Sequence, residues 1–214
     1  TPLLGHPEWE DAISWLLDGC ELEAAVEVVD TRPGQAPRTL ATYTFPSLWM
    51  WRSCFDLRYA LVNETLCVFF QDKVGCFMPL PPLGPCNKDL LDVCWRHMES
   101  INHNQDISRI ENIEEPDRPF FEAAGWRLYE KSRDYIVSRS AIASLRGDRF
   151  KHKRNLYNIF TRRGPTVFRD YQPGDQKAVL ALYERWQKER WAKHDDRIYR
   201  AMLEDSFGAL GCLL

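Results

Sequence analysis

The sequence predicts an α+β fold built on a mainly antiparallel sheet. Three runs rich in β-branched and aromatic residues follow one another closely, at 55–62, 65–71 and 75–81, and only the short turns NE and DKV separate them. Turns of that length join neighbouring antiparallel strands. Segments with helical periodicity precede and follow these runs, so we expect helices to flank the sheet.

Composition favours a globular protein of the cytoplasm. The 214 residues are 44% hydrophobic and include eight Trp and eleven Phe, which is ample for a packed core. The seven cysteines are an odd number without a Cys-x-x-Cys pair, a usage typical of reduced thiols. No apolar run reaches the ~18 residues of a membrane span, and no secretion signal is recognisable at the start. We therefore expect a cytoplasmic protein without a transmembrane segment.

Before the first of these runs, the pattern is helical and then irregular. Trp9, Ile13 and Leu16 recur at helical spacing behind an acidic start, which predicts a helix over about 7–18. Residues 21–30 remain open between helix and strand, because their valines favour a strand whereas Glu and Ala favour a helix. A Pro/Gly loop follows, so residues 1–38 are expected to form an N-terminal helix and loop.

Several further elements can be assigned from local signals. The aromatic stretch 43–55 has helical spacings and carries Pro46 in its first turn, where proline is tolerated. Residues 86–102 place a row of apolar side chains on one helical face, with Asn87 as the expected cap. The other predicted elements are strands at 108–113, 129–139 and 165–172, helices at 115–125, 173–191 and 197–210, and the start of a strand at 212–214.

Positive charge is concentrated in one region. Eight Lys or Arg stand between Arg139 and Arg163 against a single acid, Asp148, although the whole chain has a net charge of −3. Such a concentration favours an anionic partner, whether phosphate, carboxylate, tRNA or lipid headgroup. A basic helix that is merely solvated fits the same pattern, and this alternative stays open.

A helical wheel at about 100° per residue divides this basic helix into two faces. One narrow polar stripe gathers the residues suited to hold a phosphate or carboxylate, namely Lys151, Arg154, Asn155, Asn158 and Arg162. Lys153 falls on the opposite, apolar face. Its side chain must either reach past that face to water or find a buried partner, and burial would make it a candidate acid/base or carboxylate-binding group.

Other residues are weaker candidates. Tyr135 lies just before the basic helix and is suited to stack on a ligand or to hydrogen-bond with it, although core packing explains it as well. Arg52 lies in an aromatic cluster with Trp49 and Trp51 and needs a carboxylate or carbonyl partner there. The set Cys86, Cys94, His97 and His103 lacks the second well-spaced pair of a zinc site, so no metal is expected. Motifs of hydrolases, NTPases, dinucleotide enzymes and zinc proteases are absent.

Two stretches resemble a known family. YTFPSLWMWR at 43–52 and DYIVSRSAIASLRGDRFKHKRN at 134–155 are similar to the signature stretches of the phosphatidylglycerol lysyltransferase C-terminal-domain-like family, in the same order. The resemblance covers about residues 40–214. It implies two GNAT-like (N-acetyltransferase-type) domains packed through a long helix, similar to Fem-type peptidoglycan aminoacyltransferases. The implied division is a first GNAT-like domain at 39–138, a basic connecting region at 139–164 and the beginning of a second, incomplete domain at 165–214.

The resemblance also implies a function. Better-known members transfer an aminoacyl group from a charged tRNA to a lipid headgroup, so an acyl or aminoacyl transferase is expected, with aminoacyl-tRNA or acyl-CoA as donor and an amine or hydroxyl as acceptor. The pyrophosphate-loop pattern of GNAT enzymes, Q/R-x-x-G-x-G/A, is missing. The alternative is a non-catalytic module that binds an anionic ligand or RNA through the basic helix. DNA is not expected as a partner, because the chain as a whole is acidic.

Overall fold

The computed structural model describes residues 13–14, 38–62, 64–193 and 197–214. The chain divides into two units, the first formed by Thr1–Tyr129 together with Val179–Leu214 and the second by Glu130–Ala178. The predicted division into GNAT-like domains at 39–138, 139–164 and 165–214 is a separate matter and stays a prediction. Each unit is described by itself below.

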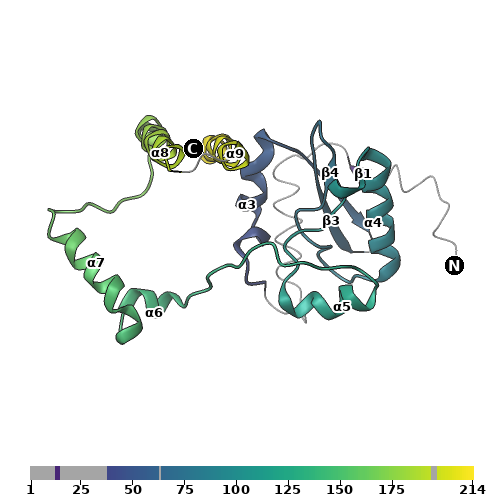
Figure 1. Cartoon of the computed structure of the whole chain (residues 1–214), viewed down its shortest axis with the longest axis horizontal. Coiled ribbons are helices and arrows are strands. Elements are labelled where there is room, and N and C mark those ends of the chain that lie inside the picture. Colours follow the sequence, from purple (N-terminus) through teal and green to yellow (C-terminus); the bar gives the residue numbers. More distant parts are fainter. Residues whose placement is uncertain (1–12, 15–37, 63, 194–196) are drawn as a thin grey trace. The chain divides into compact units, whose positions relative to one another are not determined.

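The first unit contains a sheet (Figure 1). The sheet is antiparallel, and its strands lie in chain order. Its strands are β1 Ile13–Ser14, β2 Asp56–Val62, β3 Thr65–Gln71 and β4 Cys76–Phe77. The predicted meander is thereby confirmed, as is the α+β class. Whether this sheet belongs to a GNAT-like arrangement remains a prediction.

Short turns set the register of the sheet. β2 and β3 pair from Asp56 with Gln71 up to Val62 with Thr65, and Glu64 in the tight turn adopts a φ of 68°. In the next turn the Asp72 carboxylate accepts hydrogen bonds from the N–H groups of Val74 and Gly75 at 2.8 and 3.0 Å. Such side-chain acceptors satisfy the backbone where the strand direction reverses.

Helix α4, Lys88–Ile101, covers one face of the sheet (Figure 1). Asn87 caps it as predicted, because its side chain accepts a hydrogen bond from the Leu90 N–H at 2.9 Å. The predicted apolar face is confirmed by its buried members, which are Leu90, Leu91, Cys94 and Met98. Close contacts tie the helix to β3: Cys94 Sγ lies 3.7 Å from Cys67 Sγ, and the His97 and Phe69 rings lie edge to face.

The side chain of Asn102, just after α4, hydrogen-bonds to the backbone of one residue of β4, as a neighbouring strand would. Its Oδ1 accepts a hydrogen bond from the Cys76 N–H at 2.6 Å, and its Nδ2 donates to the Cys76 carbonyl at 2.8 Å. A Cβ added at Gly75 would lie 2.3 Å from Asn102 Oδ1, so this contact requires glycine there. The amide thus pairs both backbone groups of Cys76.

Residues on the opposite sheet face pack on aromatic rings. Phe55 stacks on Phe70 with ring centroids 5.1 Å apart and meets Phe77 edge to face.

The predicted aromatic helix is present as the 3₁₀ turn η1 Ala41–Tyr43, helix α3 Phe45–Trp49 and the 3₁₀ turn η2 Met50–Ser53, with Pro46 in the first turn of α3. Tyr43 and Leu48 are almost completely buried in the core.

Two helices complete the first unit. The 3₁₀ turn η6, Pro173–Asp175, leads into α8, Gln176–Trp191, which is followed by α9, Arg197–Leu213. α9 packs on η2, with Ala209 fully buried. Tyr183 of α8 donates to the Leu203 carbonyl of α9 at 3.0 Å. The strand predicted at 212–214 is wrong, because the helical hydrogen bonding of α9 continues to Leu213.

The remaining predictions for the first unit fared unequally. The helix at 115–125 is confirmed as the 3₁₀ turn η4 Glu115–Asp117 and α5 Arg118–Ala123, followed by Gly125 with a φ of 90°. A strand was predicted at 108–113, but the structure has only one isolated parallel bridge there, between Met78 and Ile110. The helix predicted over 7–18 lies outside the described residues except at Ile13 and Ser14. It is wrong there, since both pair with β2.

The second unit contains the predicted basic helical region but no strand among its described residues. Helix α6, Arg139–Ser144, the 3₁₀ turn η5, Asp148–Phe150, and α7, Lys151–Thr161, follow one another. The prediction of strands at 129–139 and 165–172 is wrong, because neither stretch forms a regular strand. Both stretches have strand-forming side chains, but no neighbouring strand in the described chain pairs with their backbone.

Candidate functional site

The basic helix begins after a sharp joint between α6 and α7. Ser138 caps α6 by accepting a hydrogen bond from the Ala141 N–H. α6 then ends at Leu145, which is left-handed with a φ of 47°. Gly147 follows with a φ of 89°, a value that glycine adopts without a steric cost. The direction of α7 relative to α6 is therefore set by two unusual backbone positions within three residues.

Arg154 holds this joint. Its Nη1 donates to the Leu145 carbonyl and, at 2.7 Å, to the Gly147 carbonyl. A guanidinium at the end of a helix also faces the negative end of the helix dipole, which adds to the attraction. Arg154 was predicted to bind substrate. In the structure, one nitrogen of its guanidinium donates hydrogen bonds to the backbone. Its role toward a ligand stays a prediction.

The other members of the predicted stripe are exposed along α7. They are Lys151, Asn155, Asn158 and Arg162, the last of which is the residue that ends the helix. Lys153 is exposed as well, so its side chain reaches water. Within the described chain none of the three cations among these five residues forms an ion pair with an acid. Their charges are available to an external anion.

The electrostatic setting of α7 is one-sided. Its first turn contains no acidic residue, and Phe150 before it supplies no side-chain cap. Lys151 and Lys153 thus stand at the positive end of the helix dipole, where cations repel the backbone field. An anion bound there would relieve that repulsion, because the cations would share its negative charge.

The two remaining candidates occupy different surroundings. The Tyr135 side chain is almost entirely exposed, so it packs in no core within the described structure. Arg52 belongs to the first unit and has the carbonyl partners expected for it. Its guanidinium donates to the Cys212 carbonyl at 2.8 Å and to the Trp49 carbonyl at 3.1 Å, and it lies over the Trp49 ring. Arg52 thereby joins η2 to the last turn of α9. Its role as a substrate-binding residue stays a prediction.

The cysteine and histidine side chains show no metal-binding arrangement in the part of the chain that is described. Cys94 donates to Cys67, and this hydrogen bond together with burial raises the pKa of the Cys67 thiol. Burial lowers the pKa of His97, and the nearby Arg58 charge adds to that effect. The chemistry favoured here is that of neutral core side chains.

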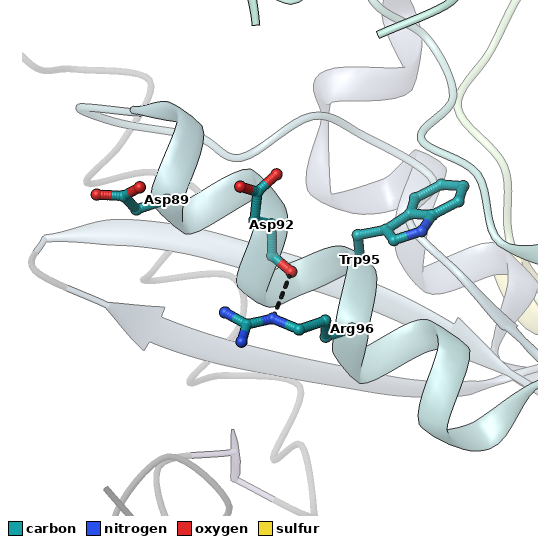
Figure 2. Close-up of a pocket in the computed structure, with 4 residues that line it drawn as sticks. All are labelled: Asp89, Asp92, Trp95 and Arg96. Atoms are coloured by element: carbon teal, nitrogen blue, oxygen red, sulfur yellow. Dashed lines mark hydrogen bonds between the residues drawn. The ribbon is translucent and has the colours of Figure 1, made fainter. Parts of the chain in front are cut away.

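A hollow of about 350 Å³ lies on α4, and no predicted site residue is among those that line it. Figure 2 shows its lining, which is Asp89, Asp92, Trp95 and Arg96. Asp92 already pairs with Lys88 at 2.6 Å, and Arg96 donates to the Asp92 carbonyl at 3.2 Å. Two of the four lining side chains, Asp92 and Arg96, thus bond within their own helix.

One polar cluster could not have been found from the sequence. Glu114 is buried, and its Oε1 accepts hydrogen bonds from the N–H groups of Thr39 and Leu40 and from the Thr39 hydroxyl, at 2.7 to 2.9 Å. Arg38 bonds to Asp117 beside it. Burial alone would raise the pKa of Glu114, but these hydrogen bonds and Arg38 outweigh it, so that the pKa is lowered. The partners are about 75 residues apart in the chain, and no local motif joins them.

No helix in the described ranges is both long enough and apolar enough to cross a bilayer. The fold defines an α+β protein with a small antiparallel sheet, and the second unit adds an exposed basic helix. The model of the phosphatidylglycerol lysyltransferase, C-terminal family matches residues 35–206, and the chain belongs to that family. The resemblance read from the two signature stretches is therefore confirmed.

A solved structure shows the same fold. It is a conserved protein of unknown function from Bacteroides thetaiotaomicron VPI-5482, 19% identical in sequence, with a TM-score of 0.66. The match covers 94% of this chain and 68% of that one. At this level of identity the similarity concerns the fold alone. No protein with a curated description matches the chain.

Proposed function

We propose that the protein is an acyl or aminoacyl transferase that moves its group from a tRNA or CoA donor to an amine or hydroxyl acceptor, such as that of a lipid headgroup. Membership of the phosphatidylglycerol lysyltransferase C-terminal family supports a transferase relation. The observation that carries the proposal beyond the family is the exposed row of cations and amides on α7. Both donor types contain phosphate groups that such a row suits.

The proposed transfer does not require a dedicated nucleophile on the protein. An acceptor amine or hydroxyl attacks the activated carbonyl of the donor, loses a proton and expels the tRNA hydroxyl or the CoA thiol. This step needs positioning and a proton acceptor. In our proposal Lys151 and Arg162 hold donor phosphates, and Asn155 and Asn158 hydrogen-bond to neighbouring polar groups. Lys153, Arg154, Tyr135 and Arg52 remain secondary candidates for substrate contact.

A second candidate function is a non-catalytic module that binds an anionic ligand or RNA. A specific observation favours it: the α7 side chains lie open to solvent in the second unit, and other residues line the hollow on α4. An open face is sufficient for binding a polyanion, whereas catalysis requires water to be excluded from the reacting groups.

Binding and transfer can be tested separately. Charged tRNA, uncharged tRNA and acyl-CoA would be titrated against the parent chain and against a Lys151→Ala, Arg162→Ala double variant. A matched control is Lys73→Ala with Lys188→Ala, which removes two exposed cations elsewhere. We expect the α7 variant alone to bind more weakly, by about 10-fold, and to lower the slope of log affinity against log salt by about 1 to 2.

Transfer would be followed with a labelled aminoacyl group or acyl group and phosphatidylglycerol vesicles or small amines as acceptors. Label that moves to an acceptor supports the transferase. Binding that depends on α7 without any transfer favours the module. Equal binding by the α7 variant and the control would show that the basic row has no role in either function.

A further inference from the structure

Two cysteines meet between the sheet and the helix that covers it. Cys67 lies on β3 and Cys94 on α4, 27 positions apart in the chain, and their Sγ atoms are 3.7 Å apart. Cys67 is 1% exposed and Cys94 is 3% exposed. At this separation the two sulfurs are within about 2 Å of the length of a disulfide bond. We call these two residues the core thiol pair.

Packing keeps the core thiol pair together. Leu90 and Met98 of α4 belong to the same buried cluster as the pair. The His97 ring of α4 also meets the Phe69 ring of β3 edge to face, with centroids 4.9 Å apart. In an unfolded chain, two residues at this sequence separation meet rarely, because closing the intervening loop costs entropy. Folding therefore raises the concentration that each thiol presents to the other.

A third thiol nearby is held differently. Cys86, just before α4, is half-buried and packs against the same core. Its Sγ donates to the Asn87 carbonyl at 3.7 Å, whereas the Cys94 Sγ donates to a thiol. Burial, together with the nearby Cys94 thiol, raises the pKa of Cys86 to about 12. Cys86 is therefore the competitor against which the pairing of Cys67 with Cys94 has to be tested.

We propose that the core thiol pair is a redox-modification site, at which Cys67 and Cys94 form a disulfide by exchange with a low-molecular-weight disulfide such as oxidised glutathione. One cysteine thiolate attacks a sulfur of the reagent, forms a mixed disulfide and expels one glutathione thiolate. The other cysteine loses its proton, attacks the protein sulfur of the mixed disulfide and expels the second glutathione. Two protein thiols are thereby oxidised, and the two glutathione thiolates take up the two protons.

Burial controls the rate of this exchange. The reagent reaches the core thiol pair only when α4 separates locally from the sheet, and the raised pKa of Cys67 keeps its thiolate scarce. Exchange is therefore slow in the closed structure, and the disulfide, once formed, is shielded from reduction in the same way. The bond joins α4 covalently to β3 and so stabilises the fold of the first unit. This proposal is independent of the proposed function, because it uses no residue of α7.

The first test compares disulfide formation in the folded and the unfolded chain. The full chain would be equilibrated with mixtures of oxidised and reduced glutathione, without denaturant and in concentrated urea. Mass spectrometry of alkylated peptides measures the fraction that contains the Cys67–Cys94 bond. We expect the equilibrium constant for its formation to be about 100-fold higher in the folded chain, which is also the factor by which such a bond favours folding.

Cysteine variants assign the effect. The urea midpoint of the parent should be higher after oxidation than after reduction, and Cys67→Ala and Cys94→Ala should each abolish this difference. Cys86→Ala is the control for the competing thiol. Cys76→Ala is the matched control for a core thiol, since Cys76 of β4 is 0% exposed. Both controls should keep the difference. The peptide map of the parent does not depend on whether any variant folds.

Three results would overturn the proposal. One is the absence of a Cys67–Cys94 peptide after the folded chain has reached equilibrium with oxidised glutathione. Another is an equilibrium constant that is no higher in the folded chain than in urea, which would show that the packed geometry opposes the bond. The last is a disulfide that joins Cys86 to either member of the core thiol pair instead.

Discussion

One nitrogen of the Arg154 guanidinium donates to two backbone carbonyls, and this restricts how freely the side chain can reach a ligand. A wheel places Arg154 in the same stripe as Lys151 and Arg162, yet the three differ in what surrounds them. The Leu145 and Gly147 carbonyls come from the joint before the helix, which a wheel does not include. Identical charges on one face can therefore have different roles.

Removing the Arg154 side chain should loosen the joint. In Arg154→Ala two carbonyls lose their donor, so amide exchange of residues 145–151 is expected to accelerate about 5-fold, which corresponds to about 1 kcal/mol. Arg154→Lys should restore part of the protection. Arg149→Ala is the control, because Arg149 lies over the ring of its own neighbour Phe150. Equal exchange in the alanine variant and the parent would show that the two hydrogen bonds of Arg154 do not hold the joint.

Glu114 links stability to pH. Its pKa in the folded chain is lowered from the ordinary value of 4.5, so its contribution to stability is present above about pH 4.5 and is lost as the pH falls through the folded-state pKa. Glu114→Gln should reduce the free energy of unfolding by about 1–2 kcal/mol at neutral pH. The difference from the parent should shrink in acid, because the parent carboxylate is then protonated.

Urea unfolding at a series of pH values measures this effect. Glu115→Gln is the matched control, since the Glu115 side chain is 87% exposed next to the buried one. It should follow the parent at every pH. Parallel loss of stability in the Glu114 variant and the parent on acidification would contradict the assignment.

At the scale of elements, α9 contains two glycines with different surroundings. A Cβ at Gly211 would meet no atom within 4 Å, whereas one at Gly208 would lie 3.4 Å from Ser53 Oγ of η2. Gly211→Ala should therefore raise the free energy of unfolding by about 0.5–1 kcal/mol, the usual gain for alanine within a helix. Gly208→Ala should gain less, and Gly208→Leu should weaken the packing of α9 on η2.

Chemical denaturation of the three variants provides the comparison. Hydrogen exchange in the last turn of α9 would show whether Gly208→Leu detaches the helix locally. If both alanine variants gained the same stability, the close approach of Gly208 to Ser53 would have no energetic consequence.

Elements set by local chemistry could be predicted from the sequence. Asn87 begins α4, Pro46 lies in the first turn of α3, and Gly125 follows α5, because capping and backbone preferences act over a few residues. Strands were predicted where alternation and hairpin turns coincided. The stretches 129–139 and 165–172 have the side chains of strands, but a strand also needs a neighbour, and the sequence of the stretch does not contain one.

The candidate site was predictable only in part. The helix α7 on which the wheel rests is present, and its two faces follow from helical geometry alone, but no residue of α7 is buried, so the binding role of the polar stripe stays a prediction. The hydrogen bonds of Arg52 with Cys212 and of Glu114 with Thr39 could not be predicted. They join residues 160 and 75 positions apart, and such contacts depend on the tertiary fold.

At the scale of the whole molecule, the two units should differ in their resistance to proteases. The first has a buried core of Leu66, Met78, Leu91 and Met98, whereas side chains throughout 131–140 and 161–172 are exposed. Limited trypsin digestion should therefore cut first after the exposed Arg133, Arg139 and Arg163. Mass spectrometry of the early fragments checks this, and early cuts within β2, β3 or α4 would contradict it.

The left-handed Leu145 in the joint has a consequence for mutation. A left-handed backbone costs a β-carbon residue about 1–2 kcal/mol relative to glycine, so Leu145 holds strain at this position. Substitution by glycine or asparagine would remove the strain at once. The corner is thus open to stabilising mutation, whereas the charges of Lys151 and Arg162 on α7 can be exchanged without altering the joint. The charge pattern of α7 and the backbone of the joint can therefore change independently of each other.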